Sequence, residues 1–411
     1  MLEEWNPQGW EKVKIKNISL DFGRGKSKHR PRDDTILYGG NYPFIQTGDV
    51  KRSFGRITKY SQTYNEKGLS QSKLWPAETM CITIAANIAE TGILTFPACF
   101  PDSIIGFVAD KKKSNVYFVE YLFRYLRYYI QSEYVGTGTA QDNINLGTFE
   151  ELEFPIPPLS VQNKIVSILK PFDDLIFNIK NKNEKLEQIV KTIFKSWFID
   201  FDGQMEFVES ELGKIPKGWM IKKMSEISEV KIGRTPPRKE AEWFTKNIGM
   251  KWVSIRDMGL SNTFLHYTLE NLTDDAIKNL KIPIIEKGMV LLSFKLTVGR
   301  VAIASEKMVS NEAIAHFKIS EPSLNNYYLY EVLKNFNYDS LGSTSSIATA
   351  INSTNIKDMK IIVPTIEILN QFKETVERLF SQINVEQKKI QILSNTRDLL
   401  LIKLVSGEIR V

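Results

Sequence analysis

The chain runs through one series of motifs twice, and this duplication constrains its fold more than any single motif does. Pro7-Gln8-Gly9-Trp10 returns as Pro216-Lys217-Gly218-Trp219, an offset of 216 − 7 = 209. Ile144-Asn145 returns as Ile351-Asn352, an offset of 351 − 144 = 207. Because the offset drifts so little over half of a 411-residue chain, we expect two copies of one domain rather than a short solenoid repeat.

Further pairs of segments fall between these two ends of the repeat. Gly23-Arg24 aligns with Gly233-Arg234 at 233 − 23 = 210. Phe44-Ile45 aligns with Trp252-Val253 at 252 − 44 = 208. The sequence therefore predicts one separate domain in each half. Two similar domains on one chain suit a target that itself has two parts.

Composition limits the class of protein. Hydrophobic residues make up 42% and charged residues 25%, which is typical of soluble globular domains. No apolar run reaches membrane-spanning length, and the first residues do not resemble a signal peptide. The two cysteines, Cys81 and Cys99, and three widely spaced histidines argue against a disulfide framework, a zinc site or a histidine-built metal centre. We expect a cytoplasmic protein that binds no metal.

Each half contains a set of short segments typical of β-strands, followed by an amphipathic helix. This order predicts an α+β domain in which a helix covers a sheet. The expected strands in the first half are 42–47, 79–84, 92–96 and 103–109, and their counterparts are 251–255, 289–294, 299–304 and 313–319. The helices that follow contain Val119, Leu122, Phe123 and Leu126 in the first half and Leu329, Val332, Leu333 and Phe336 in the second.

Beyond each domain the apolar residues change to alternating steps of four and three. The pattern extends from Ile165 to Trp197 and again from Phe372 to Leu404. Such spacing predicts two long helices that pair as an antiparallel coiled coil and hold the two domains at a fixed separation. The expected boundaries are 1–158 for the first domain, 159–205 for the central helix, 206–364 for the second domain and 365–411 for the last helix and tail.

Taken in order, these motifs resemble a known family over essentially the whole chain. Besides the two Pro-x-Gly-Trp motifs, it has Gly-Arg-Thr-Pro-Pro at 233–237, then Trp252-Val253-Ser254, and a final segment from Leu399 to Ile409. The combination resembles the specificity (S) subunit of type I restriction–modification systems. The resemblance implies two target-recognition domains, each reading one half of a split sequence in double-stranded DNA.

The resemblance also implies partners. The long helices would dock two methyltransferase (M) subunits, and motor-nuclease (R) subunits would join to complete the restriction enzyme. S-adenosylmethionine would bind to the methyltransferase, and ATP and Mg²⁺ to the motor subunit, with no cofactor on this chain. The adenines of the target would be the methylated bases.

Clusters of basic residues in both halves are candidates for phosphate contact, because lysine and arginine neutralise the DNA backbone without reading sequence. The first cluster lies in a loop that has no acid before Asp33. Its members are Arg24, Lys26, Lys28, His29, Arg30 and Arg32, and the second half supplies Lys231, Arg234, Arg238 and Lys239. Thr235, in the same loop of the second half, is a further expected DNA contact. Lys51, Arg52 and Lys295 complete the set of expected DNA contacts.

Base readout needs side chains that offer paired donors and acceptors. The two halves share apolar residues at 44–45 and 252–253 but differ in the polar residues that follow, as readers of two different half-sites would. The candidates are Gln46, Thr47 and Asp49 in the first half, Ser254, Arg256 and Asp257 in the second, and Gln141, Asn143 and Ser345 on later loops. For Asp49 and Asp257, an alternative is that they only cap or brace the strand before them.

Catalysis by this chain has little support in the sequence. Asp102, Asp110 and Lys112 superficially fit a metal-dependent nuclease, but the second half has no counterpart. The Asn/Asp-Pro-Pro-aromatic motif of amino-methyltransferases is missing from the chain. We therefore expect a non-catalytic recognition subunit. The alternatives are an autonomous DNA-modifying or DNA-cleaving enzyme, and a scaffold whose coiled coil is its whole function.

Overall fold

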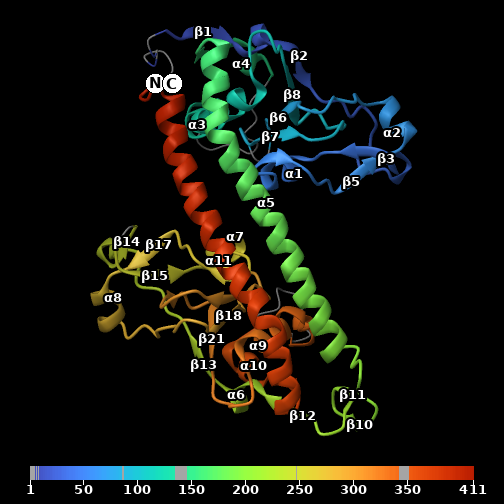
Figure 1. The fold of residues 1–411 in the computed structure, drawn as a ribbon, viewed down its shortest axis with the longest axis vertical. Coiled ribbons are helices and arrows are strands. Elements are labelled where there is room, and N and C mark those ends of the chain that lie inside the picture. The colour runs from blue at the N-terminus through green and yellow to red at the C-terminus, as the bar shows by residue number, and fades with distance from the viewer. Residues whose placement is uncertain are drawn as a thin grey trace. The chain divides into compact units, whose positions relative to one another are not determined.

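The computed structural model describes residues 5, 7, 9–85, 88–134, 146–246, 248–341 and 351–411, without the side chains of residues 133, 134 and 148. The chain forms two compact units (Figure 1). Unit 1 comprises Met1–Leu175 and Ser394–Val411, and unit 2 comprises Ile176–Leu393. Each unit thus takes in part of both long helices, and each is described by itself below.

Unit 1 is built on a five-stranded sheet with the order β2-β8-β6-β7-β4. Its neighbours are antiparallel except β4, which runs parallel to β7. The strands are β2 (Ser19–Arg24), β8 (Ile104–Ala109), β6 (Met80–Thr83), β7 (Thr91–Leu94) and β4 (Gly55–Ile57). Strands β6 and β7 are buried along their whole length, as expected for the centre of a covered sheet.

Unit 2 repeats this sheet with the order β13-β21-β18-β19-β16. Here too, neighbouring strands are antiparallel, with the exception of β16, which runs parallel to β19. The strands are β13 (Ser228–Ile232), β21 (Ile314–Ile319), β18 (Val290–Ser293), β19 (Val301–Ala304) and β16 (Phe264–Leu265). The duplication read from the sequence is confirmed by this shared topology.

Smaller sheets complete each unit. In unit 1, β3 (Tyr38–Phe44) pairs with β5 (Gln62–Tyr64), and β1 (Glu11–Lys14) pairs with β9 (Glu153–Ile156). In unit 2, the corresponding pairs lie in a sheet of order β14-β17-β15-β20 and in the pair β12-β22. These strands are β14 (Phe244–Thr245), β17 (Glu270–Leu272), β15 (Met250–Val253), β20 (Val309–Ser310), β12 (Met220–Lys223) and β22 (Lys360–Val363). Unit 2 also has the hairpin β10-β11 (Phe207–Ser210 and Gly213–Pro216).

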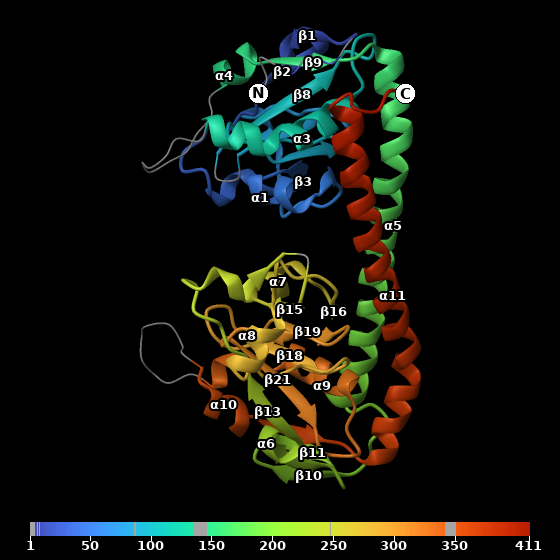
Figure 2. The same cartoon turned by 90° about the vertical axis from the view of Figure 1, so that its left-hand side faces the viewer.

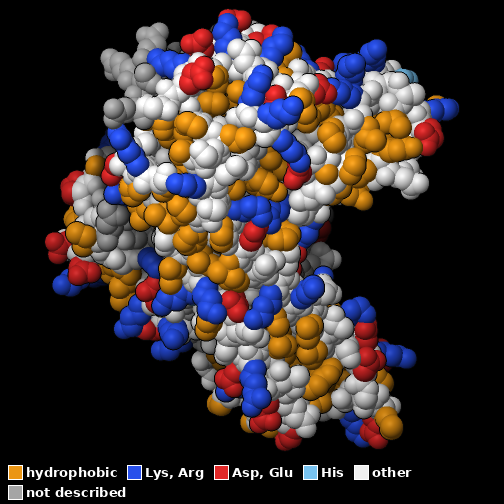
Figure 3. Space-filling model, turned by 45° about the horizontal axis from the view of Figure 1, so that its top comes forward, with side chains coloured by type: hydrophobic (Ala, Val, Ile, Leu, Met, Phe, Trp, Pro, Cys, Tyr) orange, Lys and Arg blue, Asp and Glu red, His pale blue; other side chains and the backbone are white. Residues whose placement is uncertain are grey.

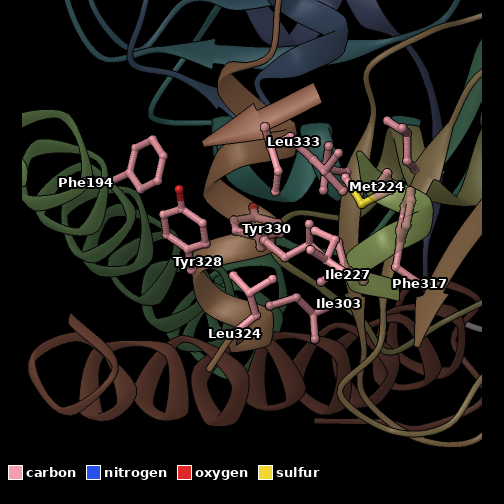
Figure 4. Close-up of a cluster of buried hydrophobic side chains, with 14 of the residues drawn as sticks. Phe194, Met224, Ile227, Ile303, Phe317, Leu324, Tyr328, Tyr330 and Leu333 are labelled. Atoms are coloured by element: carbon pink, nitrogen blue, oxygen red, sulfur yellow. The ribbon is translucent and has the colours of Figure 1, made fainter. Parts of the chain in front are cut away.

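One helix packs against the main sheet of each unit, as the amphipathic patterns predict (Figure 2). It is α3 (Val116–Tyr134) in unit 1 and α9 (Asn326–Asn335) in unit 2. In the core of unit 2, Tyr328 of α9 faces Phe194 with ring centroids 5.9 Å apart (Figure 4). The shorter helices are α1 (Thr47–Arg52), α2 (Glu66–Ser70), α4 (Leu146–Glu151), α6 (Met224–Ile227), α7 (Ile255–Leu260), α8 (Asp274–Asn279) and α10 (Ser353–Asp358).

The two long helices predicted from the heptad pattern are present and pack together. They are α5 (Leu159–Phe198) and α11 (Ile366–Val405), each of 40 residues. In unit 2, Lys182 bonds Glu386 at 2.8 Å, and the Phe194 and Phe372 rings lie 6.2 Å apart. Position 182 of α5 contacts position 386 of α11, and the later position 194 contacts the earlier position 372, so the two helices run antiparallel.

In unit 1 the same two helices are joined by an ion pair in which Arg397 Nη1 donates to Asp173 Oδ1 at 2.7 Å. Arg124 of α3 lies 3.5 Å from the same carboxylate, and it also bonds the buried Glu120. The Arg124 and Arg397 guanidinium groups outweigh burial and hold the pKa of Asp173 below its usual range. This buried network attaches α3 to both long helices within unit 1.

The strand β2 contains an irregularity that changes the alignment of the two halves. The pairing of β2 with β8 shifts register between Ser19 and Asp21, so Leu20 is an extra, exposed residue in the manner of a β-bulge. The offset therefore falls from 228 − 19 = 209 before the bulge to 232 − 24 = 208 after it. The alignment of Gly23-Arg24 with Gly233-Arg234 is consequently wrong, and Gly25 is the equivalent of Gly233.

Candidate nucleic-acid interface

In unit 2, three segments that are distant in the sequence meet at the end of the main sheet. The Arg234 amide donates to the Ser310 carbonyl at 2.8 Å, and the Asn311 amide donates to the Val253 carbonyl at 3.0 Å. These bonds attach both the basic loop after β13 and the start of α7 to the turn after β20. The candidates Arg234, Thr235, Ser254 and Arg256 are thereby brought onto neighbouring backbone segments.

A fourth segment joins this surface. The Phe294 amide donates to the Ala313 carbonyl at 3.0 Å, and Arg300 Nη1 donates to the carbonyl of Ile255 at 2.6 Å. The loop between β18 and β19, which carries the candidate Lys295, therefore lies next to the first turn of α7.

Unit 1 repeats the arrangement. The Gly25 amide donates to the Ile104 carbonyl at 2.9 Å, and the Ile45 amide donates to the Cys99 carbonyl at 2.8 Å. The Ile84 amide donates to the Ser103 carbonyl at 3.0 Å, which places the start of the β6–β7 loop beside the same turn. Both units thus present a basic loop, a helix start and a hairpin loop around one turn, and we call this the tip surface of each unit.

The helix start of unit 1 is held by a buried aspartate. Asp49 is only 7% exposed, and its Oδ2 accepts from the Gln46 amide at 2.9 Å and from Ser61 Oγ at 3.2 Å. Its Oδ1 accepts from Arg52 at 2.7 Å. Because this cap starts α1 at Thr47, the expected strand 42–47 ends early, at Phe44.

The helix start of unit 2 uses the same device. Asp257 is 2% exposed and accepts from the Ser254 amide at 2.8 Å, from Ser254 Oγ at 2.7 Å and from the Leu269 amide at 3.0 Å. The expected strand 251–255 accordingly ends at Val253, and Ile255 begins α7. The bonds of both aspartates go to their own chain, which favours the capping interpretation for Asp49 and Asp257 over base contact.

The first basic loop is fastened at its base while its cations face solvent. Ser27 is buried, and the amides of Lys28 and His29 donate to Gln71 Oε1 at 2.5 and 3.0 Å. Arg24, Lys26 and Lys28 are exposed, and no ion pair to any of them occurs among the described residues. These three side chains are therefore available to a phosphate backbone.

The remaining basic residues of this loop are already engaged. Arg32 Nη2 donates to both oxygens of Asp102 at 2.8 and 2.9 Å, and His29 Nε2 lies 2.8 Å from Asp34 Oδ2. Arg30 Nη1 donates to the carbonyls of Ser27 and His29. The loop carries a smaller free positive charge than its composition alone indicates.

The second basic loop is also held in place by its own side chains. Arg234 donates to the Leu280 carbonyl at 2.5 Å, and Thr235 Oγ1 bonds Glu312. Arg238 donates to both oxygens of Glu270 and stacks over two rings. The stacking partners are Phe244 and Trp252, with centroids 4.3 and 4.8 Å from the guanidinium carbon. Lys239 is exposed.

The other candidates sit on or beside the short helices. Arg256 and Lys295 are exposed on the tip surface of unit 2, and Lys51 and Arg52 are exposed on the last turn of α1. Gln46 Nε2 donates to Gln62 Oε1 at 2.5 Å. Gln62 was not among the DNA contacts predicted from the sequence. The one signal that could have indicated it is its position at the start of a short strand, β5, next to a turn. Gln141, Asn143 and Ser345 lie outside the described residues.

The acidic residues of the nuclease alternative do not converge. Asp102 precedes β8 and Asp110 follows it, so the length of a six-residue strand separates them. Asp102 bonds Arg32, while Asp110 accepts from the Lys112 amide at 3.0 Å in a turn. No group of three or more potential metal ligands occurs in the part of the chain that the structure describes.

The face of the molecule in Figure 3 shows lysine and arginine side chains interspersed with aspartate and glutamate. No broad patch of one sign dominates that face, so the case for DNA contact depends on the local tip surfaces. Among the described helices, none combines the length and the apolar character that crossing a membrane requires.

Comparison with known proteins identifies a protein family whose model matches both halves of this chain. The model of the type I restriction modification DNA specificity domain matches residues 7–188 and 216–395. The MjaIX specificity subunit of a type I restriction enzyme from Methanocaldococcus jannaschii is 30% identical over 98% of this chain and 94% of its own length. The HindI specificity subunit from Haemophilus influenzae is 24% identical over 97% of this chain and 99% of its own.

A solved structure shares the fold. The S subunit of a type I restriction–modification system from M. genitalium superposes with a TM-score of 0.57 at 16% identity, covering 96% of each chain. Two copies of the family domain, matching the two units built on the same sheet order, account for most of the sequence. This chain therefore belongs to the family of type I restriction–modification DNA specificity subunits.

Proposed function

We propose that this chain selects the DNA sequence on which a type I restriction–modification enzyme acts, with each unit reading one half of a bipartite site. The observation that carries the proposal is the repeated tip surface, in which one scaffold supports different polar side chains. At equivalent positions Gln46 is replaced by Ser254, and Gly48 by Arg256. A common support with exchanged side chains is what two readers of different base sequences require.

A domain exchange tests independent reading. Residues 216–364 are replaced by the same segment of another specificity subunit, and methylated adenines are mapped across the host genome. The expected result is a change in one half of the methylated motif, with the other half retained. A change in both halves would contradict the proposal that each unit reads alone.

The exposed cations of the tip surfaces supply the part of the affinity that is independent of sequence. Arg24, Lys26 and Lys28 in unit 1 and Arg256, Lys239 and Lys295 in unit 2 are expected to lie against phosphates. Each mismatched base pair in a half-site is expected to cost about 1–3 kcal/mol, whereas removal of a phosphate-binding cation weakens binding to all sequences alike.

The long helices are proposed to dock two methyltransferase subunits and to fix the spacing of the two half-sites. Support comes from apolar side chains that α5 and α11 leave exposed, among them Leu175, Ile189, Val385 and Leu399. Val385→Asp is expected to weaken copurification with the methyltransferase without changing DNA binding by the isolated chain. We place S-adenosylmethionine on the methyltransferase, and ATP and Mg²⁺ on the motor-nuclease subunits.

We further propose that the chain itself is not catalytic. The separation of Asp102 from Asp110 supports this, because one metal ion cannot bind both carboxylates across the length of a strand. The purified chain incubated with DNA and Mg²⁺ is expected to neither cleave nor modify it. Activity that disappears in Asp110→Asn would instead establish the autonomous-enzyme alternative.

A different measurement tests the alternative of a scaffold without DNA contact. In a gel-shift titration, changing Arg24, Lys26, Lys28, Arg30 and Arg32 together to Ala is expected to weaken DNA binding. Unchanged affinity would favour the scaffold, since its function would lie in the paired helices alone.

A further inference from the structure

Leu296 is an apolar side chain that the fold of unit 2 presents to solvent. It is 95% exposed, and its backbone has φ 62°, a left-handed conformation that leucine rarely adopts. It lies in the loop between β18 and β19, between Lys295 and Thr297. The side chain contributes nothing to the core, so packing in the core does not account for its exposure or for its left-handed backbone.

The loop holds Leu296 outward through its own hydrogen bonds. Ser293 Oγ donates to the Thr297 carbonyl at 2.5 Å and accepts from the Arg300 amide at 3.1 Å. The Gly299 amide donates to the Ser293 carbonyl at 3.0 Å, which closes the loop at its base. The tip is therefore fixed by the ends of two buried strands, a preorganised position for a side chain that makes contact with another molecule.

The surroundings of this tip indicate the kind of molecule. Arg300 fastens the loop to the first turn of α7, beside the exposed Arg256, and Lys295 directly precedes Leu296. The nearby acid of the turn, Glu312, is bonded to Thr235. An apolar tip flanked by exposed cations matches a groove of DNA, whose phosphates lie on both sides of the stacked bases.

We propose that Leu296 enters the duplex as an apolar wedge and partly unstacks a base step in the half-site read by unit 2. Apolar side chains of this kind insert between base steps and kink DNA, and easily unstacked pyrimidine–purine steps accept them at the lowest cost. Leu296 thereby reads the deformability of the step rather than its hydrogen-bonding pattern. This inference rests on the proposed function, because it assumes that the tip surface contacts DNA.

The first half of the chain lacks an equivalent residue. Strands β6 and β18 align at 290 − 80 = 210. At this offset Leu296 corresponds in sequence to 296 − 210 = 86, which is Ala86, and a methyl group is too short to insert between bases. The wedge therefore predicts an asymmetric complex, in which the half-site of unit 2 is distorted by a side chain that the half-site of unit 1 never meets.

The test uses the chain assembled with its methyltransferase subunits and duplexes of the motif obtained from methylation mapping. 2-Aminopurine, whose fluorescence rises on unstacking, is placed at successive positions in each half. The wild-type complex is expected to brighten the probe at one step of the second half. Leu296→Ala and Leu296→Gly are expected to abolish this signal and to weaken binding about tenfold or more.

Two variants separate the wedge from a structural role. Leu296→Gly relieves the left-handed backbone, so its melting temperature should rise while its DNA affinity falls. Met205 is 94% exposed in the same unit but lies before β10, outside the tip surface, so Met205→Ala is the matched control and should leave the signal intact.

The possible failures are distinguishable. If the wild-type complex does not bind the duplex, the proposed function itself fails. If it binds but the Leu296 variants match the wild type in both affinity and probe signal, only the wedge is overturned. A Leu296 variant that loses methyltransferase subunits yet keeps its DNA affinity would make this residue a protein contact, which also overturns the wedge.

Discussion

Gly25 and Gly233 occupy the same place in the two units, although their immediate neighbours in sequence differ. Each amide donates to the carbonyl of the isoleucine that begins the adjoining strand, Ile104 at 2.9 Å and Ile314 at 3.1 Å. Each Cα faces the backbone of the turn on which the tip surface is built, with no room for a side chain. These two glycines therefore allow the basic loop to meet the turn.

The first prediction concerns this close approach. A Cβ at Gly25 would overlap the carbonyl oxygen of Phe100, and one at Gly233 would overlap that of Ser310. Gly25→Ala and Gly233→Ala are each expected to destabilise their own unit by about 1–3 kcal/mol, measured by thermal or urea unfolding. Gly23→Ala is the matched control, because a Cβ there meets nothing within 4 Å. Equal losses at Gly23 and Gly25 would contradict the revised alignment.

The second prediction separates capping from base reading at the buried aspartates. Asp49→Ala and Asp257→Ala each remove a helix cap and leave buried amides without an acceptor, so we expect a loss of about 1–3 kcal/mol in the free energy of unfolding. The methylated motif should remain the same, with weaker methylation overall. A new base preference in the methylated motif at undiminished stability would instead identify the aspartate as a reader.

The third prediction uses the difference between free and engaged cations in the first basic loop. Changing Arg24, Lys26 and Lys28 together to Ala should reduce the slope of log K against log salt by about 0.9 for each phosphate that the protein no longer neutralises. Changing Arg30 and Arg32 should reduce it less, because Arg32 already bonds both oxygens of Asp102. DNA-binding titrations over a range of salt concentrations measure both slopes. A larger effect from Arg30 and Arg32 would mean that these bonds open on DNA.

The fourth prediction concerns the pH dependence of stability. Burial raises the pKa of Glu331 to about 7, with Lys334 opposing this shift and Glu187 adding to it. Since its pKa in the unfolded chain is near 4.3, the folded state retains a proton that the unfolded state releases. The free energy of unfolding should therefore fall as pH rises from about 4 to 7, and stay low above 7.

Glu331→Gln removes this titration. The variant should gain stability relative to the wild type as pH rises from 5 to 8, by on the order of 3 kcal/mol at most. Thermal unfolding at pH 5, 6, 7 and 8 provides the comparison. Glu374→Gln, at an exposed position of α11, is measured alongside as the matched Glu-to-Gln variant. A pH-independent difference for Glu331→Gln would contradict the prediction.

The sequence was sufficient for the duplication, the α+β class and the two long helices, because these depend on periodicity over many residues. The heptad run ending at Trp197 and the second ending at Leu404 lie within α5 and α11. The expected strands at 79–84 and 289–294 contain β6 and β18. Patterns of this length average over local exceptions, so they locate elements well even where their ends shift by a residue or two.

The candidate site was predicted less completely, since its residues act through neighbours that are remote in sequence. Arg32 was expected to contact phosphate, but the fold places Asp102 beside it. The sequence left open whether Asp257 reads a base or only caps or braces the strand before it, and its burial and its bonds to Ser254 favour the cap. Gln62 had no signal beyond its position at the start of a short strand. The fold moved the alignment of the two basic loops by two residues, from Gly23 to Gly25 opposite Gly233, and the bulge at Leu20 accounts for one of these two residues. Local polarity identifies which residues can bind DNA, whereas long-range contacts decide which of them are free to do so.

The amino-acid sequence by itself thus determined that one domain occurs twice, that two long helices accompany it and that the chain resembles a DNA specificity subunit. Only the tertiary structure decided that Gly25 matches Gly233, that Asp49 and Asp257 are buried caps, and that Leu296 is held out in solvent. The physical reason is that repetition and amphipathic periodicity are written along the chain, while burial, ion pairing and close packing depend on which segments meet in space.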